Sequence, residues 1–454
     1  MRAVIVGGGI TGLAAASALR GHNVTLLERE SRLGGKILTE RIDGFLLEAG
    51  PDSFLTTKPE AVALCRTLGL GDDLVGTKSG RIVYVLSGGR LHPLPDGLML
   101  MAPTKLFPFL RSSLFSLREK VRIATELVLP SHAHDGDESL GAFVRRRFGG
   151  AALDRLAAPL LAGIYAGDAE TMSLRATFPQ LLEIEHTRGS VIAGMMAQRA
   201  RARSVPTAGR VPLFMTLRGG LDRLVEQLHT ILGDVDVRLG KTATDLSRDR
   251  SSYVIHLQDG GDVEADLVIL STPAFVTADL IRRLVPDAAA LLQQIPYAST
   301  ATISLGYRER DVPTMAGDGF VVARDERHHL TACTWVSTKW PGRAPAGFVL
   351  LRAYVGSARD PNILERSDDE IVALVRAELG AAMGLSADPV LTHIVRWPRS
   401  MPQYTIGHLD RLAAVKQTLQ PFPGIVLAGA GYRGIGLPDC IRQGLAAART
   451  AVAV

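Results

Sequence analysis

Three glycines and one glutamate near the start of the chain have the types and spacing of a dinucleotide-binding turn. Gly7, Gly9 and Gly12 follow the apolar run at residues 3–6, and Glu28 closes the next apolar run. In such a turn the first glycine permits the sharp bend, the second lets backbone approach a pyrophosphate, and the third lets a helix pack on a strand. The glutamate can accept hydrogen bonds from both ribose hydroxyls and would repel a 2′-phosphate, which argues against NADP. An ordinary glycine turn is the alternative.

The helix expected behind this turn would offer unpaired N–H groups and a partial positive charge to phosphate oxygens. A strand before the motif, a helix after it and an acid at the expected distance together favour the nucleotide interpretation. The predicted contacts are Gly7, Gly8, Gly9, Ile10, Thr11, Gly12, Glu28 and Arg29.

A second pair of glycines narrows the type of nucleotide. Arg32-Leu33-Gly34-Gly35-Lys36 comes directly after the second predicted strand. Adjacent glycines let the chain pass close to a bulky ligand, and Arg32 or Lys36 can pair with phosphate. A hairpin turn with a solvated arginine is the alternative. The pair resembles the flavoprotein amine-oxidase superfamily, where it lies along the FAD pyrophosphate, so we predict non-covalently bound FAD. The further predicted contacts are Arg32, Gly35, Lys36, Gly50, Pro51, Asp52 and Ser53.

The helices and strands that must position these residues are expected to form a mixed α/β and α+β fold. It includes a discontinuous, Rossmann-type (GR2-like) FAD-binding domain. Its predicted parts are residues 1–80, 210–275 and 395–454. They include a helix over 217–232, a strand over 236–239, a hairpin over 253–266 and a buried strand over 266–272. In the superfamily, the residue matching Val237 reaches the adenine through its backbone.

The C-terminal helix is predicted to begin near Ile435, Gly436 and Leu437 and to run to about residue 452. In the superfamily such an N-terminus is aimed at the pyrimidine oxygens of the flavin, where it would stabilise negative charge on the reduced ring. Asp439 would be a cap or a first-turn acid of this helix.

The rest of the chain divides into a sheet-forming part and a helical part. Residues 81–90 and 276–394 show alternating patterns that predict an antiparallel, substrate-binding sheet, with strands near 301–307, 319–323, 330–336 and 348–355. Residues 91–209 predict a helical insertion. In it, residues 91–116 favour a core-facing or pocket-lining helical hairpin over the alternative of peripheral membrane contact, and Arg145, Arg146 and Arg147 are expected at the solvent-facing end of a helix over 139–148.

Composition excludes several classes of protein. The chain has 454 residues, 46% apolar and 21% charged, with a net charge of +5 and no basic run that would suggest nucleic acid. Three cysteines without a CxxC motif predict neither disulfides nor a metal site, and favour a reducing compartment. No segment predicts a signal peptide or a membrane span. We expect a cytoplasmic protein, with membrane association as the alternative.

Several blocks of sequence resemble the FAD-dependent porphyrinogen oxidases over essentially the whole chain. They are residues 48–54, 163–168, 401–408 and 436–441, and residues 331–335, 339–341 and 350–356 look most like the enzymes of Gram-positive-type bacteria. The resemblance implies oxygen-dependent, six-electron oxidation of coproporphyrinogen III to coproporphyrin III in haem biosynthesis, with three H2O2 formed. Protoporphyrinogen IX is the alternative substrate. A tetrapyrrole and O2 are the implied partners, and a transient contact with the next haem-pathway enzyme is compatible with it.

The resemblance assigns no catalytic side chain, because the flavin carries the chemistry. It implies that Gly163 faces the flavin across the substrate, with a helix-breaking turn as the alternative. His92 would lie near a propionate or serve as a turn residue, and Arg352 and Lys339 are cations that could face the pocket. Trp397 and Tyr404 match positions near the flavin, with buried aromatic packing as their alternative.

Three rival functions remain at this stage. A flavin amine oxidase would need a cage of aromatic side chains, and an aromatic content of only 5% argues against it. A carotenoid desaturase would suit residues 91–116 but not the blocks at 163–168 and 401–408. A non-enzymatic protein of the same fold, like the Rab escort proteins, would lack FAD, against which stands the intact segment Arg32–Lys36.

Overall fold

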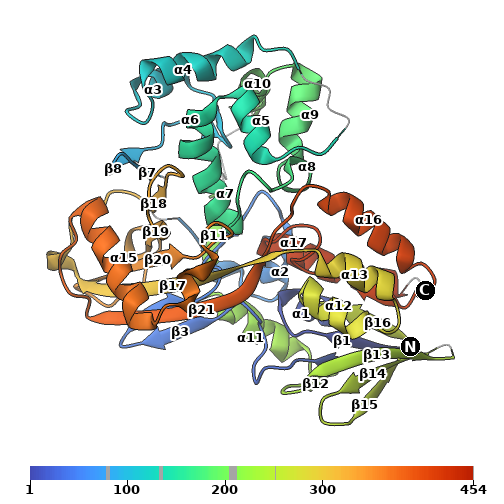
Figure 1. Ribbon diagram of the computed structural model, residues 1–454. Coiled ribbons are helices and arrows are strands. Elements are labelled where there is room, and N and C mark those ends of the chain that lie inside the picture. Colours follow the sequence, from blue (N-terminus) through green and yellow to red (C-terminus); the bar gives the residue numbers. More distant parts are fainter. Residues whose placement is uncertain (78–81, 132–135, 204–211, 251, 453–454) are drawn as a thin grey trace. The chain divides into compact units, whose positions relative to one another are not determined.

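The computed structural model describes residues 1–77, 82–131, 136–203, 212–250 and 252–452. The chain forms two compact units (Figure 1). Unit 1 contains Met1–Gly76, Pro212–Pro296 and His408–Val454, and unit 2 contains Thr77–Val211 and Tyr297–Gly407. The predicted domain limits at residues 80–81 and 209–210 lie outside the described residues.

Unit 1 is built on a five-stranded sheet in which every neighbouring pair is parallel. The strand order is β12-β2-β1-β16-β22, with β1 at Arg2–Val6, β2 at Asn23–Leu27, β12 at Asp236–Arg238, β16 at Leu267–Leu270 and β22 at Ile425–Leu427. The central strands are almost continuously apolar because both faces of a parallel sheet are covered. This confirms the predicted fold class.

Helices and a small sheet cover the two faces of this parallel sheet. The helices of unit 1 are α1 (Ile10–Ala18), α2 (Glu60–Thr67), α11 (Asp222–Ile231), α12 (Ala274–Ile281), α13 (Pro286–Gln293), α16 (His408–Thr418) and α17 (Leu437–Val452). Helices α1, α11 and α17 share one core with Ile5 of β1. Strands β13 (Ala243–Asp249), β14 (Ser252–Leu257) and β15 (Asp262–Ala265) form an antiparallel sheet that contacts β1 and β16. The short strands β3 (Thr39–Ile42) and β4 (Phe45–Glu48) pair as a hairpin.

The approach of α1 to α17 depends on one glycine. A Cβ atom on Gly444 would lie 2.2 Å from the carbonyl oxygen of Thr11, so only glycine lets these two helices pack at this distance. The packing joins the first and last helices of the chain in one core.

Unit 2 contains a seven-stranded sheet with the order β21-β17-β20-β19-β18-β7-β8. The strands are β7 (Val83–Ser87), β8 (Arg90–Pro93), β17 (Tyr297–Arg308), β18 (Gly319–Val322), β19 (Leu330–Trp335), β20 (Phe348–Val355) and β21 (Leu391–Pro402). All pairs are antiparallel except β7 with β18, so the sheet is mixed. Helix α15 (Asp368–Met383) packs its buried Ile371, Val375 and Leu379 on the apolar face of β17 and β20 (Figure 1).

The helical part of unit 2 follows β8. It contains α3 (Leu106–Arg111), α4 (Leu117–Ala124), α5 (Leu140–Arg147), α6 (Gly150–Ala152), α7 (Ala158–Tyr165), α8 (Leu174–Thr177), α9 (Pro179–Arg188) and α10 (Val191–Arg203), with a π-helical turn at Leu153–Ala157. Ser139 caps α5 by accepting a hydrogen bond from the amide of Ala142 at 3.0 Å. Among the described helices, none is both long enough and apolar enough to span a bilayer.

Two elements differ from the predictions. The helix predicted over 217–232 begins only at Asp222, because β11 (Phe214–Leu217) pairs with β5 (Phe54–Leu55) and β6 (Leu74–Gly76). The segment 91–116 is no helical hairpin, since its first half forms β8 and the hairpin of β9 (Leu98–Met99) with β10 (Ala102–Pro103).

The division into units also places two segments differently from the predicted domains. Residues 276–296 lie in unit 1, where α13 packs on α16, and residues 395–407 lie in unit 2, because β21 continues the seven-stranded sheet.

Candidate active site

The glycine turn of unit 1 is shaped by two close approaches and one open space. A Cβ on Gly12 would lie 1.9 Å from the carbonyl oxygen of Gly7, so helix and strand could not pack with any other residue there. Gly7 has a φ of +108°, which glycine adopts readily. A Cβ on Gly9 would meet no atom of the described residues within 4 Å. Gly9 therefore borders free space at the N-terminus of α1, where a ligand can approach the backbone.

Glu28 is a buried carboxylate directly after β2, as predicted for the ribose-binding acid. Its two oxygens accept hydrogen bonds from the amides of Gly8 at 2.7 Å and Glu30 at 2.9 Å. Its own amide donates to the carbonyl of Arg238 at 3.0 Å, which places Val237 on the neighbouring strand. Each carboxylate oxygen keeps a further lone pair for a ligand hydroxyl.

The second pair of glycines packs directly on the first turn. The amide of Gly34 donates to the carbonyl of Gly8 at 2.9 Å, and a Cβ on Gly35 would lie 3.2 Å from the Cα of Gly9. Arg32 holds the loop together by donating to the carbonyls of its own segment, at Leu33, Gly35 and Ile37. The two glycine motifs thus form a single cradle.

Lys36 places a partly buried cation in this cradle. Burial lowers the pKa of Lys36 below its usual value, since desolvation disfavours the charged ammonium group. The backbone beside it is tight, because a Cβ on Gly50 would lie 1.8 Å from the carbonyl oxygen of Lys36. A bound anion at this position would favour the charged form of the lysine.

The start of α17 adds an acid that is neutralised by two cations. Asp439 is 4% exposed and accepts hydrogen bonds from Lys58 at 2.6 Å and Arg442 at 2.7 Å. Its carboxylate lies against the turn at Gly434, where a Cβ would meet it at 2.5 Å. Asp439 is therefore a first-turn acid, and nothing in the sequence indicates its partner Lys58.

The predicted cofactor contacts divide between the two units. Unit 1 brings together the glycine turn, Glu28, the Arg32–Lys36 loop and the start of α17, whereas Trp397 lies on β21 of unit 2. Arg29 is exposed and donates to Glu30, and Ser53 donates to Asp52 at 2.6 Å. Helix N-termini, open space at Gly9, a buried carboxylate and a partly buried lysine fit a nucleotide with a diphosphate.

The second set of predicted residues lies in unit 2, on the face of the sheet opposite α15. Arg352 of β20 is 3% exposed and is in register with Ser304 of β17 and Thr334 of β19. His393 of β21 pairs with the same serine. The Arg352 guanidinium lies 4.9 Å from the ring centroid of Tyr354. A polar stripe with a buried cation thus crosses this sheet.

Gly163 lies on α7, which contacts β18 and β19. It is exposed, and a Cβ there would have only Val321 of β18 nearby, at 4.0 Å. Two of the sequence blocks that carry the porphyrinogen resemblance, 163–168 and 401–408, meet here, because the side-chain amide of Gln403 donates to the carbonyl of Tyr165 at 2.8 Å. Tyr404 is 1% exposed and its ring packs edge-on against Tyr165, which accords with the packing alternative.

His92 lies on β8, and both of its ring nitrogens have partners. Nδ1 is 2.9 Å from the hydroxyl of Ser113, and Nε2 is 3.1 Å from the carbonyl of Ser87. A propionate that bound this ring would have to displace one of these two partners. His92 is thus a strand residue rather than the turn residue of the alternative, and its contacts suit a structural role.

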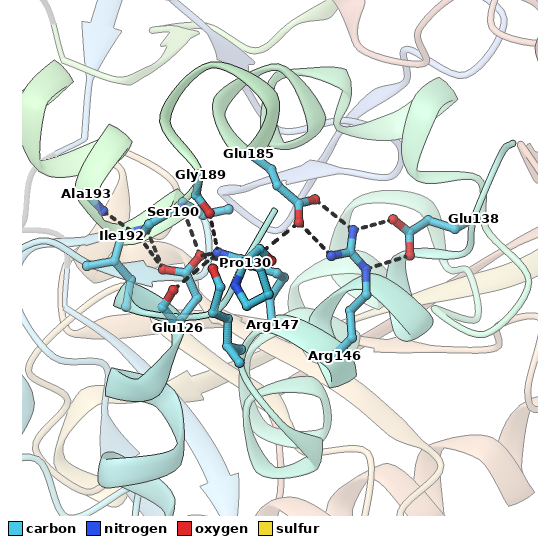
Figure 2. A network of polar contacts seen from close by, with 12 residues as sticks. Glu126, Pro130, Glu138, Arg146, Arg147, Glu185, Gly189, Ser190, Ile192 and Ala193 are labelled. Atoms are coloured by element: carbon cyan, nitrogen blue, oxygen red, sulfur yellow. Dashed lines mark hydrogen bonds and ion pairs between the residues drawn. The ribbon is translucent and has the colours of Figure 1, made fainter. Parts of the chain in front are cut away.

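The arginines at the end of α5 do not form the solvent-facing cluster that was predicted. Arg147 is 1% exposed and binds Glu126, which is itself fully buried, and Arg146 binds Glu138 and Glu185, each at 2.6 Å (Figure 2). The prediction was wrong for these two residues because both bind carboxylates that the fold of unit 2 brings near: Glu126 from the turn after α4, Glu138 from the segment before α5, and Glu185 from α9. Only Arg145 remains mostly exposed.

Within the described residues, no group of three or more histidines, cysteines or acids could hold a metal ion, and Cys65, Cys333 and Cys440 are buried thiols without disulfides.

Comparisons with known proteins match the chain over almost its full length. The family model described as flavin-containing amine oxidoreductase matches residues 10–452. Coproporphyrinogen III oxidase of Bacillus subtilis is 41% identical over 99% of this chain and 97% of that protein, and the chloroplastic protoporphyrinogen oxidase 1 of Arabidopsis thaliana is 31% identical over 96% and 85%. A crystal structure from Exiguobacterium sp. 255-15, provisionally described as a protoporphyrinogen oxidase, is 36% identical with a TM-score of 0.88 over 99% and 98%. These matches confirm FAD as the cofactor, and the chain belongs to the flavin-containing amine oxidoreductase family and, within it, to the porphyrinogen oxidases.

Proposed function

We propose that this protein oxidises coproporphyrinogen III to coproporphyrin III, transferring six electrons to three O2 and forming three H2O2. The observation that carries the proposal is the difference in similarity among relatives. Identity to the Bacillus subtilis coproporphyrinogen III oxidase is 41%, against 31% for the Arabidopsis thaliana protoporphyrinogen oxidase. Both relatives are matched over nearly the whole of this chain.

Unit 1 would hold the nucleotide part of the cofactor. When bound, FAD supplies the acceptor for hydride from the porphyrinogen and returns the electrons to O2. The amides at the start of α1 and Lys36 would bind the diphosphate, and Glu28 would accept hydrogen bonds from the ribose. The backbone of Val237 would contact the adenine, and residues 435–437 would offer helix amides to the flavin. Trp397 is the contact proposed from unit 2.

Unit 2 would bind the tetrapyrrole. Gly163 leaves open space on α7, and Arg352 is a buried cation that suits a propionate. Coproporphyrinogen carries four propionates and protoporphyrinogen two. A charge-assisted hydrogen bond contributes about 1.5–3 kcal/mol, so pairing two further propionates would favour the tetracarboxylate by about 3–6 kcal/mol.

A side-by-side oxidation assay tests the substrate. Each porphyrinogen, prepared by chemical reduction of its porphyrin, is mixed with the flavin-loaded enzyme in air, and porphyrin fluorescence and H2O2 are both measured. We expect faster oxidation of coproporphyrinogen III, with three H2O2 for each porphyrin. Equal rates or a preference for protoporphyrinogen IX would assign the second substrate instead, and no oxidation of either would reject the proposal.

We also propose peripheral contact with an anionic membrane, through an apolar surface formed by α3, α4 and the turn after α4. Seven large apolar side chains are exposed there, including Phe107 at 67%, Leu117 at 74% and Val128 at 82%. The others are Leu106, Leu110, Val121 and Leu127. Arg111 and Arg118 are exposed on the same two helices, which suits anionic headgroups. Leu106, Phe107 and Leu110 are thus exposed and not turned to the core, whereas Phe109 among them is buried, as the core-facing prediction expects.

Sedimentation with lipid vesicles tests this contact. The protein should pellet with vesicles that contain phosphatidylglycerol and remain in solution with phosphatidylcholine alone. The double variant Phe107→Asp and Leu117→Asp should no longer pellet with these vesicles. The control Val390→Asp, at an exposed position on another part of unit 2, should pellet like the wild type. Unchanged pelleting of the double variant would reject this surface.

A further inference from the structure

We propose that Gln403 is a positioning residue that holds the substrate-facing end of α7 in place. This inference rests on the proposed function, because it concerns the presentation of Gly163 to the substrate. Gln403 directly follows β21 and is 4% exposed. Its side-chain amide donates to the carbonyl of Tyr165, the last residue of α7, at 2.8 Å, and to the carbonyl of Met401 at 2.9 Å.

The end of α7 needs an external partner. The last carbonyl groups of a helix receive no hydrogen bond from the helix itself. A glycine in the left-handed conformation commonly follows the last helical residues. Here Ala166 takes that conformation, with φ at +50°, which costs roughly 1–2 kcal/mol for a residue with a side chain. The side-chain amide of Gln403 donates a hydrogen bond to one of these carbonyl groups, that of Tyr165, and this bond offsets the strain at Ala166.

The surroundings of Gly167, in the turn after α7, show that the side chain of Gln403 is closely packed. A Cβ on Gly167 would lie 2.8 Å from Oε1 of Gln403 and 3.2 Å from Met172. The glutamine amide therefore packs between the end of α7 and the turn that follows.

Neighbouring backbone bonds attach the same turn to the segment after β21. The amide of Ile406 donates to the carbonyl of Thr171 at 3.0 Å, and the amide of Ala358 donates to the carbonyl of Ala166 at 2.8 Å. These bonds fix the turn at 166–173, whereas the side chain of Gln403 donates to the helix itself, at the carbonyl of Tyr165. Gly163 lies two residues before the carbonyl that Gln403 holds, in the same final turn.

The central test replaces Gln403 with Met, which keeps the length of the side chain and removes both donors. We expect KM for coproporphyrinogen III to rise about tenfold, since losing one or two buried hydrogen bonds changes an equilibrium by roughly 5- to 30-fold. We expect kcat to change less than twofold and the flavin absorbance to be unchanged. The control is Gln180→Met, at an exposed position on α9, which should leave KM as in the wild type.

Hydrogen exchange gives a readout that does not depend on the substrate. The amides of residues 162–168 should exchange at least tenfold faster in Gln403→Met than in the wild type, while those of β20 should not change. If the Met variant does not retain flavin, Gln403→Asn, which keeps an amide on a shorter side chain, replaces it in both measurements, with the same expectations.

The outcomes separate this inference from the proposed function. A wild type that does not oxidise coproporphyrinogen rejects the function, and unchanged exchange at residues 162–168 then also rejects the positioning role. A fully active wild type together with a Gln403 variant of unchanged KM and exchange rejects the positioning role alone. Gly163→Val serves as the reference: it should raise KM without changing exchange at the end of α7.

Discussion

Two glycines of the same turn, Gly9 and Gly12, should respond in opposite ways to a side chain, because one borders free space and the other borders backbone. Gly12→Ala would place a Cβ 1.9 Å from the carbonyl of Gly7, whereas ordinary contact begins at 3.4 Å. The strand or the helix must therefore move by about 1.5 Å. Overpacking of this kind costs about 3 kcal/mol, at the upper end of the usual range, since the nearest atom belongs to the backbone and cannot turn aside as a side chain can.

Gly9→Glu should leave the protein without flavin largely unaffected. Gly9 has a φ of −70° and a ψ of 176°, which any residue adopts, and a Cβ there meets no atom within 4 Å. With a diphosphate in that space, however, the added carboxylate would face like charge. At about 4 Å and an effective dielectric constant of about 20, the repulsion is about 4 kcal/mol, or roughly a thousandfold in the Kd for FAD.

Two measurements separate the glycines. Urea unfolding of the flavin-free proteins should show Gly9→Glu close to the wild type and Gly12→Ala destabilised by about 3 kcal/mol. Flavin absorbance after gel filtration should be absent from Gly9→Glu. A Gly9→Glu variant that stays yellow with the wild-type Kd would refute the assignment of this space to the diphosphate, and a stable Gly12→Ala would refute the packing argument.

Three further predictions concern the interior of each unit. Glu126→Gln should destabilise the protein by about 3–5 kcal/mol in urea unfolding, since it leaves the buried Arg147 without its main carboxylate, while the exposed Glu183→Gln should cost almost nothing. Gly444→Ala should lower both stability and flavin content, because its Cβ would separate α1 from α17. Burial raises the pKa of Cys440 to about 11 and of Cys65 to about 12, from 9.0, so these protons are held more tightly in the native state. Stability should therefore fall as the pH rises above about 9, and Cys→Ser variants should lose that dependence in urea titrations at different pH.

The cofactor turn could be predicted because its determinants are local. Gly7 and Gly12 are five residues apart, and the contact that forbids a Cβ at one involves the carbonyl of the other. The residue types and their spacing therefore carry the geometry. The position of Glu28 is local as well, because it depends only on the lengths of β1, α1 and β2, which follow one another directly in the chain.

Contacts between distant segments could not be predicted from residue types. Lys58 and Asp439 are 381 positions apart, and nothing near either residue indicates the other. Arg147 follows two further arginines, a pattern typical of a solvated helix end, yet Glu126 lies buried opposite it in unit 2. A sequence shows that a charge is present, but its burial depends on which carboxylate the fold brings near.

The apolar surface of unit 2 shows the same limit for hydrophobic residues. In α4, Leu117 and Val121 are four positions apart and so share one face of the helix, a spacing that normally marks the side turned to the core. Here that face is exposed, while Ile123 on another face is buried. Periodicity identifies an apolar face but not what covers it, because a core and a lipid headgroup layer select the same side chains. The exposed cation Arg118 on the same helix suits the anionic surface that we propose, since such a surface attracts a cation that a core would exclude.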